Sequence, residues 1–300
     1  MVQATLASMR HYCPSVPVCL VVDGDFDVSD LEREYRPIVL RVSDLSSAEM
    51  RKLIANNYRA KLAAMWEGPF EFYVWMDSDA IAWGDFTPRL RPELDFQIFW
   101  SEISIPEEAS EVSPWLARFY FDMGKLRHFD AKFKWQGHPY FCSGAFASRR
   151  NAIPFDEWTK VEEWGRQEEG LFAWGEMGML NYIVHAKAQR GELKTDSTDL
   201  QHVWGHHGKQ ELIEDCLGSG WHFPKKIRRP RVAHFCWRKP FLFDRKAYSR
   251  PFTIARLEHH RRHHGNLGAW LAVLNEERRI VSSKLMRRLK RYASLSTPNR

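Results

Sequence analysis

The chain has 300 residues, of which 44% are hydrophobic and 14% aromatic, enough for the core of one large α/β domain or two small ones. No apolar run approaches the roughly 18 to 20 residues of a membrane-spanning helix. The net charge of +6 arises at the end of the chain, where residues 250–300 hold twelve Lys and Arg against three Glu. The basic excess is therefore not spread over the fold, and no nucleic-acid partner is expected.

Five cysteines, an odd number without a Cys-x-x-Cys spacing, predict reduced structural thiols and a cytoplasmic protein. The cysteines are Cys13, Cys19, Cys142, Cys216 and Cys236.

Helix and strand signals alternate along the first hundred residues. The pattern predicts helices over residues 4–12, 30–35 and 46–66, and strands over 17–22, 37–42, 71–76 and 95–100. Strands separated by helices indicate an α/β fold with a mostly parallel central sheet and helices on both faces.

The second half of the chain continues this alternation. Strands are predicted over 141–148 and 231–237, and helices over 154–166 and 175–187. After Pro240 the sequence is helical and basic. We expect one α/β domain over residues 1–245 and a basic helical extension over residues 246–300.

The strongest chemical signal is Asp77-Ser78-Asp79, which follows an apolar and aromatic run. Side chains two residues apart lie on one face of a strand, so the two aspartates are expected to project together from its carboxyl end. Ligands of open α/β sheets bind at that end of the strands. Two carboxylates there suit Mg²⁺ or Mn²⁺. The alternative is a solvated strand end without a ligand.

Three further features accompany this pair. Ser143-Gly144 lies in an apolar segment, where the glycine permits a close approach of a ligand or forms a bulge. Glu176 lies near the start of a predicted helix, where the helix dipole also favours an acid. His234 on the late strand precedes Lys239, a residue suited to hold a phosphate as a point charge.

The chain resembles nucleotide-sugar glycosyltransferases of the GT-A fold over roughly residues 3–245. The group that it resembles is glycogenin-like and includes bacterial lipopolysaccharide galactosyl- and glucosyltransferases. The motifs that carry the resemblance are, in chain order, Tyr58-Arg59-Ala60-Lys61, Asp77-Ser78-Asp79, Phe141-Cys142-Ser143-Gly144, the acid before Leu180-Asn181, and His234 with Lys239-Pro240.

The resemblance implies a metal-dependent transferase that moves a hexose from a nucleotide-diphosphate sugar, a UDP-sugar, to a carbohydrate or lipid-linked glycan acceptor, with retention of configuration. It implies that Asp77, Asp79 and His234 bind Mn²⁺ or Mg²⁺, and that Glu176 contacts the donor sugar as the catalytic candidate. The implied donor-binding residues are Lys61, Asp77, Ser78, Asp79, Ser143, Gly144 and Lys239.

The sequence departs from the family pattern at three places. Met1 falls where the helix after the first strand of the family begins, so that strand is expected to be missing. Met177 stands where the family often has a glutamine. The interval between His234 and Lys239 is one residue shorter than usual.

Two other functions remain open from the sequence. One is a phosphatase-like α/β hydrolase that uses Asp77 as nucleophile and Asp79 as acid, although Ile81 stands where that class usually carries Thr or Val. The other is a non-catalytic relative that acts as a binding protein.

The end of the chain forms a basic amphipathic pattern. Between Arg278 and Tyr292, seven basic residues surround Val281, Leu285 and Leu289 at helical spacing. Such a helix docks on the body of the protein or on an anionic membrane surface, which makes peripheral binding to the inner membrane face an expectation for residues 278–292.

Overall fold

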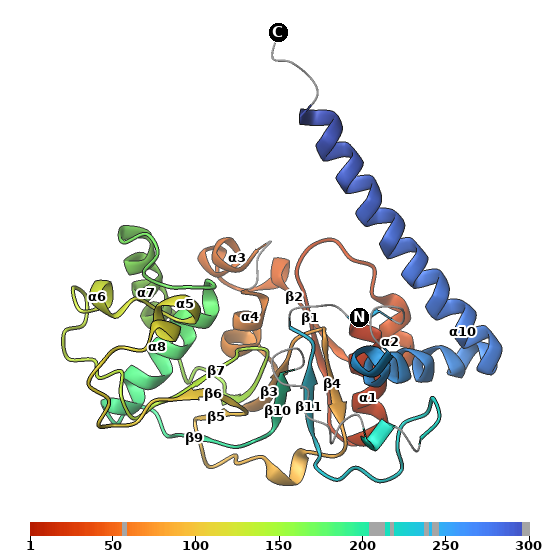
Figure 1. Cartoon of the computed structure of the whole chain (residues 1–300), viewed down its shortest axis with the longest axis horizontal. Helices are drawn as coiled ribbons and strands as arrows, with labels where there is room; N and C mark the ends of the chain where they lie inside the picture. Colours follow the sequence, from red (N-terminus) through yellow and green to blue (C-terminus); the bar gives the residue numbers. More distant parts are fainter. Residues whose placement is uncertain (56–58, 204–213, 217–218, 237–239, 242–245, 296–300) are drawn as a thin grey trace.

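The computed structural model describes residues 1–55, 59–203, 214–216, 219–236, 240–241 and 246–295 (Figure 1). It confirms the predicted α/β class. Within the described part of the chain, no helix has both the length and the apolarity needed to cross a membrane.

The first part of the chain follows the predicted order of elements. Strands β1 (Cys19–Val22) and β2 (Ile38–Arg41) form a parallel pair. The predicted segment 46–66 forms two helices, the first of which is capped by the Ser47 hydroxyl. The helices are α1 (Val2–Tyr12), α2 (Ser29–Tyr35), α3 (Ala48–Ile54) and α4 (Ala60–Glu67), with a 3₁₀ turn η1 (Val42–Asp44) before α3.

Two further sheets form the centre of the fold. The four-stranded sheet has the order β3-β8-β5-β9, and the three-stranded sheet has the order β10-β11-β4. The strands of the first are β3 (Phe72–Met76), β5 (Phe96–Ile98), β8 (Ala145–Arg149) and β9 (Thr195–Ser197); those of the second are β4 (Ala80–Trp83), β10 (Gln201–Val203) and β11 (Arg231–His234).

The pairing of the strands is more mixed than the mostly parallel sheet expected. The pairs β1–β2, β10–β11 and β5–β9 are parallel, whereas β3–β8, β5–β8 and β4–β11 are antiparallel. Strand β8 is antiparallel to both of its neighbours, so it interrupts the parallel order that alternating helices and strands would give.

The segment between β5 and α8 supplies many residues of the hydrophobic core. The single strand predicted over residues 141–148 is two strands, β7 and β8, separated by Cys142–Gly144. Aromatic residues of this segment, among them Tyr140, Phe146 and Trp158, belong to the largest hydrophobic cluster. Besides β8, the segment contains β6 (Ser101–Ser104), α5 (Pro114–Phe119), α6 (Met123–Leu126), β7 (Pro139–Phe141) and α7 (Phe155–Gln167); α8 (Glu176–Gln189) follows it, and a 3₁₀ turn η2 (Thr87–Arg89) precedes β5.

The chain ends in α10 (Lys246–Leu295), which is kinked at Gly265, a residue with φ of 61°. The part before the kink is buried around Phe252 and Ile254. After the kink, Ala269 and Val273 still pack against Leu257, and the end of the helix projects from the body (Figure 1). The salt bridge between Arg256 and Glu277, at 2.7 Å, joins the two parts. The division into residues 1–245 and 246–300 stays a prediction, and its boundary coincides with the start of α10.

Candidate metal centre

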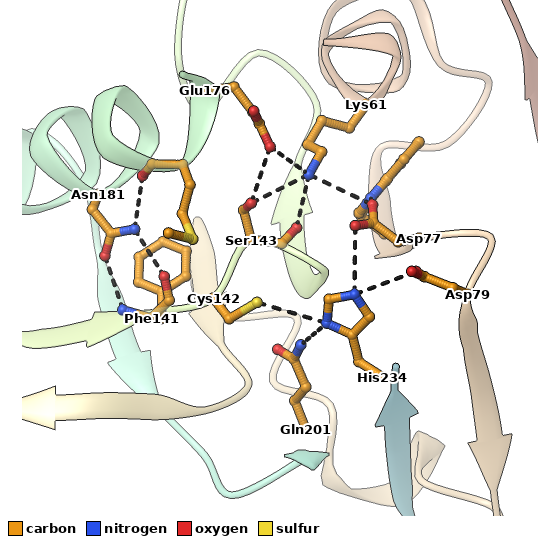
Figure 2. Close-up of polar contacts among 12 residues, drawn as sticks. Lys61, Asp77, Asp79, Phe141, Cys142, Ser143, Glu176, Asn181, Gln201 and His234 are labelled. Carbon is orange, nitrogen blue, oxygen red and sulfur yellow. Dashed lines mark hydrogen bonds and ion pairs between the residues drawn. The ribbon is translucent and has the colours of Figure 1, made fainter. Parts of the chain in front are cut away.

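The two aspartates lie in the tight turn between β3 and β4 (Figure 2). The amide of Ala80 donates to the carbonyl of Asp77 at 2.9 Å, which closes the turn. The expectation that Asp77 and Asp79 share one face of a single strand is therefore wrong. The turn brings them together instead, because it reverses the chain directly after β3.

His234 completes a cluster with these aspartates. It is the last residue of β11, where it pairs in register with Ala80, the residue after Asp79. Its Nε2 atom lies 3.3 Å from Asp79 Oδ1 and 3.7 Å from Asp77 Oδ2. One ligand atom from each of the three side chains falls within 4.8 Å of the others, so the group could hold a metal ion.

The second nitrogen of His234 has partners of its own. With the side-chain amide of Gln201 oriented so that its nitrogen donates to the carbonyls of Cys142 and Ala145, its oxygen accepts from His234 Nδ1 at 3.0 Å. The Cys142 sulfur lies 3.6 Å from the same nitrogen. A hydrogen on Nδ1 leaves Nε2 to face the two carboxylates, as a metal-binding histidine requires.

The cluster is electrostatically suited to a cation. Burial alone lowers the pKa of His234, but the Cys142 sulfur and the carboxylates of Asp79 and Asp77 outweigh it and raise the pKa to about 10. The surroundings therefore favour positive charge at this point. Two carboxylate oxygens and one imidazole nitrogen form a donor set that fits Mn²⁺ or Mg²⁺, and the ion would replace the histidine proton.

Lys61, in the first turn of α4, connects the aspartates to a second acidic group. Its Nζ lies 3.0 Å from Glu176 Oε1 and 3.5 Å from Asp77 Oδ1, and it donates to the carbonyl and hydroxyl oxygens of Ser143 at 3.2 Å. Burial alone lowers the pKa of Lys61, but Asp77 and Glu176 raise it further than burial lowers it. The ammonium therefore stays charged and holds the two carboxylates in place.

The fold around α8 positions Glu176 and Ser143. Glu176 is the first residue of α8, and its Oε1 accepts from the Ser143 hydroxyl at 3.3 Å. Further along α8, the amide side chain of Asn181 bonds both the N–H and the C=O of Phe141, each at 2.9 Å. Because Phe141 ends β7, this clamp fixes the start of the Cys142–Gly144 connection.

Most of the predicted site residues come together in this region (Figure 2). Lys61, Asp79, Ser143, Glu176 and His234 are each less than 9% exposed. The side chain of Asp77 is 31% exposed and accepts from Trp75 Nε1 at 2.7 Å. Ser78 lies in the turn between the aspartates, and Gly144 lies against the His234 ring. Lys239 lies outside the described residues.

Gln201 and Trp75 also contact the site and were not predicted from the sequence. Gln201 is fully buried in β10, whose sequence Gln-His-Val contains no apolar run that would have marked it as a buried strand. Trp75 gave no signal either, because an aromatic residue is common in a strand.

A cavity of about 600 Å³ opens beside the cluster. Lys61, Asp77, Ser78, Asp79 and Glu176 line it together, so the acidic and basic groups share one space that a ligand can enter.

No protein-family model and no curated protein matches the chain. Among solved structures, the chain is similar to the apo form of mouse xyloside xylosyltransferase 1, with 11% sequence identity and a TM-score of 0.43 over 80% of this chain and 92% of that chain. At this distance the similarity assigns no activity, and function is inferred from the site residues.

Proposed function

We propose that the protein is a glycosyltransferase that moves a hexose from a nucleotide-diphosphate sugar to a carbohydrate or glycan acceptor. The observation that supports this proposal is the cluster of Asp77, Asp79 and His234 beside a cavity that Lys61 and Glu176 also line. A divalent ion at the cluster would supply charge stabilisation for the diphosphate leaving group. The proposed donor is a UDP-sugar, and the proposed ion is Mn²⁺ or Mg²⁺.

Each residue of the candidate site has a proposed role. Asp77, Asp79 and His234 would hold the ion, and Gln201 would keep the His234 ring in the ligating orientation. Lys61 would act as a positioning residue, because its ammonium is already bonded to Ser143 and paired with Glu176 and Asp77. Lys239 remains a proposed diphosphate contact.

Glu176 is the proposed contact to the donor sugar. Its Oε1 accepts from Lys61 and Ser143, and the residue lines the cavity. A carboxylate fixed in this way is poised to interact with the reacting sugar without first being reorganised. Retention of configuration is part of the proposal, as the family resemblance implies.

A phosphatase-like hydrolase is the rival enzyme, and one observation disfavours it. Asp79 would have to donate a proton as general acid, yet its carboxylate lies 3.3 Å from His234 Nε2. A cation at this point, whether the histidinium or a bound metal ion, opposes a role of Asp79 as proton donor. A non-catalytic binding protein remains the third candidate.

We also propose that α10 attaches the protein to the inner face of a membrane, close to a lipid-linked acceptor. Leu267, Leu271, Leu274 and Val281 are between 38% and 75% exposed and share one helix face. Residues 278–300 carry eight Lys and Arg and no acid. An apolar stripe combined with positive charge is typical of helices that lie on anionic bilayers.

A titration with UDP, with and without Mn²⁺, tests the proposed activity. The proposal predicts UDP binding that is at least about tenfold tighter with Mn²⁺, and slow release of UDP from a UDP-hexose. Metal-dependent hydrolysis of a simple phosphomonoester, without UDP binding, would favour the hydrolase. UDP binding without any turnover across a panel of UDP-hexoses and glycan acceptors would favour the binding protein.

A further inference from the structure

Two tryptophans lie open to solvent, although the chain contains thirteen. Among the described residues, Trp115 in α5 is 45% exposed and Trp174, just before α8, is 59% exposed, whereas the other tryptophans are buried or half-buried. Large aromatic side chains gain free energy when they leave water. Exposed tryptophans that lie together therefore indicate a surface that another molecule covers.

The backbone at Trp174 is strained. Its φ of 54° lies in the left-handed region, which bulky side chains rarely adopt, and the next residue, Gly175, has a φ of 58°. The chain turns at these two residues and enters α8 at Glu176. Strained residues cluster at functional sites, where the surrounding structure fixes them in place.

The indole ring of Trp174 is held by α5. Its Nε1 atom donates to the carbonyl of Arg118 at 3.2 Å. This bond uses the one polar group of the indole and fixes the direction of the ring. The exposed part of Trp174 is therefore aromatic surface on a side chain whose position is already defined.

Trp115 is supported in a similar way. Its ring stacks on Phe119, with 4.7 Å between the ring centroids and 15° between the planes. Phe119 is itself only 6% exposed, so it anchors the pair to the body of the protein. Trp115 thus offers exposed aromatic surface over a buried base.

Arg118 connects the two tryptophans. Its carbonyl bonds Trp174, and its guanidinium carbon lies 5.8 Å from the centre of the Trp115 ring and 5.2 Å from that of Phe119. The side chain of Arg118 is exposed, which leaves hydrogen-bond donors of its guanidinium accessible from solvent. We call Trp115, Arg118 and Trp174 together the aromatic platform.

The aromatic platform is joined to the start of α8 by close backbone packing. The amide of Ala173 donates to the carbonyl of Tyr120, the residue after α5, at 2.8 Å. A Cβ atom on Gly178 would lie 2.0 Å from the same carbonyl oxygen. The end of α5 and the first turn of α8 are therefore in direct contact, and α5 lies beside α8 in Figure 1.

This packing places the aromatic platform next to the candidate site. Trp174 precedes Glu176 by two residues, so their Cα atoms are at most about 7 Å apart. The Glu176 side chain is buried and lines the cavity that the metal cluster shares. An acceptor has to approach the donor sugar from outside this cavity, and the platform provides exposed surface close to it.

We propose that the aromatic platform binds a pyranose ring of the glycan acceptor, an inference that rests on the proposed transferase function. One face of a pyranose consists of C–H groups with partial positive charge, which are attracted to the negative face of an indole. The hydroxyl groups at the rim of the same ring accept hydrogen bonds from the Arg118 guanidinium.

The composition of the aromatic platform favours a sugar over an apolar partner. A lipid chain or an apolar peptide side chain would cover Arg118 without accepting its hydrogen bonds, which costs free energy. A sugar ring satisfies both kinds of surface, because it combines an apolar face with a polar rim. The chemistry of the ligand thus follows from a guanidinium placed between two indoles.

Titration of the full-length protein with lactose, cellobiose and maltose tests the proposal. The protein is labelled with ¹⁵N at its tryptophan indoles, and the indole signals are followed by NMR without metal or nucleotide. At least one of the three sugars should shift the Trp115 and Trp174 signals with a common dissociation constant. The signals of Trp83 and Trp158, which are fully buried, should stay unchanged. Glycerol, which has hydroxyl groups but no ring face, is the control ligand.

Substitutions identify the rings that carry the binding. Trp174→Ala and Trp115→Ala should each weaken sugar binding about tenfold or more, as loss of a central tryptophan does at binding surfaces. Trp174→Phe keeps an aromatic face and should stay within about threefold of the parent. Phe26→Ala removes a 63% exposed aromatic residue from the loop between β1 and α2 and should leave sugar binding unchanged.

The kinetics provide a second readout. For a sugar that also accepts a hexose, Trp174→Ala should raise KM for that sugar about tenfold, while the Kd for UDP with Mn²⁺ stays within about threefold of the parent. An equal loss of UDP affinity in the folded variant would give Trp174 a structural role and overturn the proposal.

The sugar and UDP titrations separate this inference from the proposed function. A protein that binds UDP with Mn²⁺ but shows no shift of Trp115 or Trp174 with any of the three sugars would overturn the platform and leave the transferase in place. Sugar binding at the platform without UDP binding would overturn the transferase instead. Shifts of equal size with glycerol, or undiminished sugar binding in the Trp115→Ala/Trp174→Ala double variant, would also overturn the platform.

Discussion

Gly144 and His234 are packed so closely that no side chain fits between them. A Cβ atom on Gly144 would lie 2.0 Å from Cε1 and 2.2 Å from Nδ1 of His234. Any side chain at position 144 would clash with the His234 ring, so a glycine is required there. Gly144 thus allows the imidazole of His234, the proposed metal ligand, to lie against the backbone.

Substitution Gly144→Ala should displace the His234 ring and weaken Mn²⁺ binding by about tenfold or more, as loss of ligand orientation does in metal sites. Calorimetric titration with Mn²⁺ measures the effect. Gly165→Ala, in helix α7, is the matched control. A Cβ atom on Gly165 would meet only the side chain of Phe172, at 3.3 Å. Unchanged Mn²⁺ affinity in folded Gly144→Ala would exclude His234 as a ligand.

Glu176→Gln should depress turnover much more than nucleotide affinity. The amide keeps the size of the side chain but removes the charge that faces the proposed donor sugar, an interaction made at the reacting part of the substrate. We expect kcat to fall about a hundredfold, with Kd for UDP within about threefold of the parent. The exposed residue Glu169, changed to Gln, serves as control. An equal loss of UDP affinity would give Glu176 a structural role, and unchanged kinetics would remove it from the site.

Glu276 should make the stability of the protein depend on acid pH. Burial alone raises its pKa, but hydrogen bonds and charge from His260 and Arg256 outweigh it and lower the pKa from 4.5 to about 2. Because the pKa is lower in the folded state, the stabilisation is complete above about pH 4.5 and is lost as the pH falls toward 2.

Glu276→Gln is therefore expected to lower the free energy of unfolding by roughly 2 kcal/mol at pH 7, and by clearly less at pH 3. Urea denaturation of parent and variant at the two pH values measures the difference. A destabilisation of the same size at both pH values would show that the charge of Glu276 does not contribute.

Deletion of residues 278–300 should abolish salt-sensitive binding to anionic vesicles and leave the melting temperature unchanged. In the described part of the tail, Val281 is 62% and Met286 54% exposed, so their removal uncovers no core. Each basic residue near an anionic surface contributes about 1 kcal/mol, and salt screens this attraction. Vesicle co-sedimentation of parent and truncated protein measures the binding. A large fall in melting temperature, with no vesicle binding by the parent, would show instead that the tail docks on the body.

The sequence predicted the chemistry of the candidate site better than its geometry. Asp77 and Asp79 were identified because two acids directly after an apolar run indicate a ligand site at the end of a strand. Their convergence through a turn was not predicted, because spacing alone does not distinguish a strand end from a tight reversal of direction. His234 lies 155 residues beyond Asp79 and was associated with it through the family resemblance alone.

The sheet illustrates the same limit. Helix and strand positions followed from local periodicity, as for α1 and β1. The antiparallel pairing of β8 with β3 and β5 depends on contacts between distant segments that no local pattern encodes. Gln201 was missed for the same reason, since its partner His234 lies on another strand.

The measurement that tests the central claim most directly is an electron paramagnetic resonance titration of the protein with Mn²⁺. The account predicts one bound ion per chain in the parent, an affinity at least about a hundredfold weaker in Asp79→Ala, and no change in Asp25→Ala, which removes an exposed acid. Thermal melting establishes that the variants are folded. Mn²⁺ binding of parental affinity in folded Asp79→Ala would contradict the assignment of Asp77, Asp79 and His234 as a metal centre.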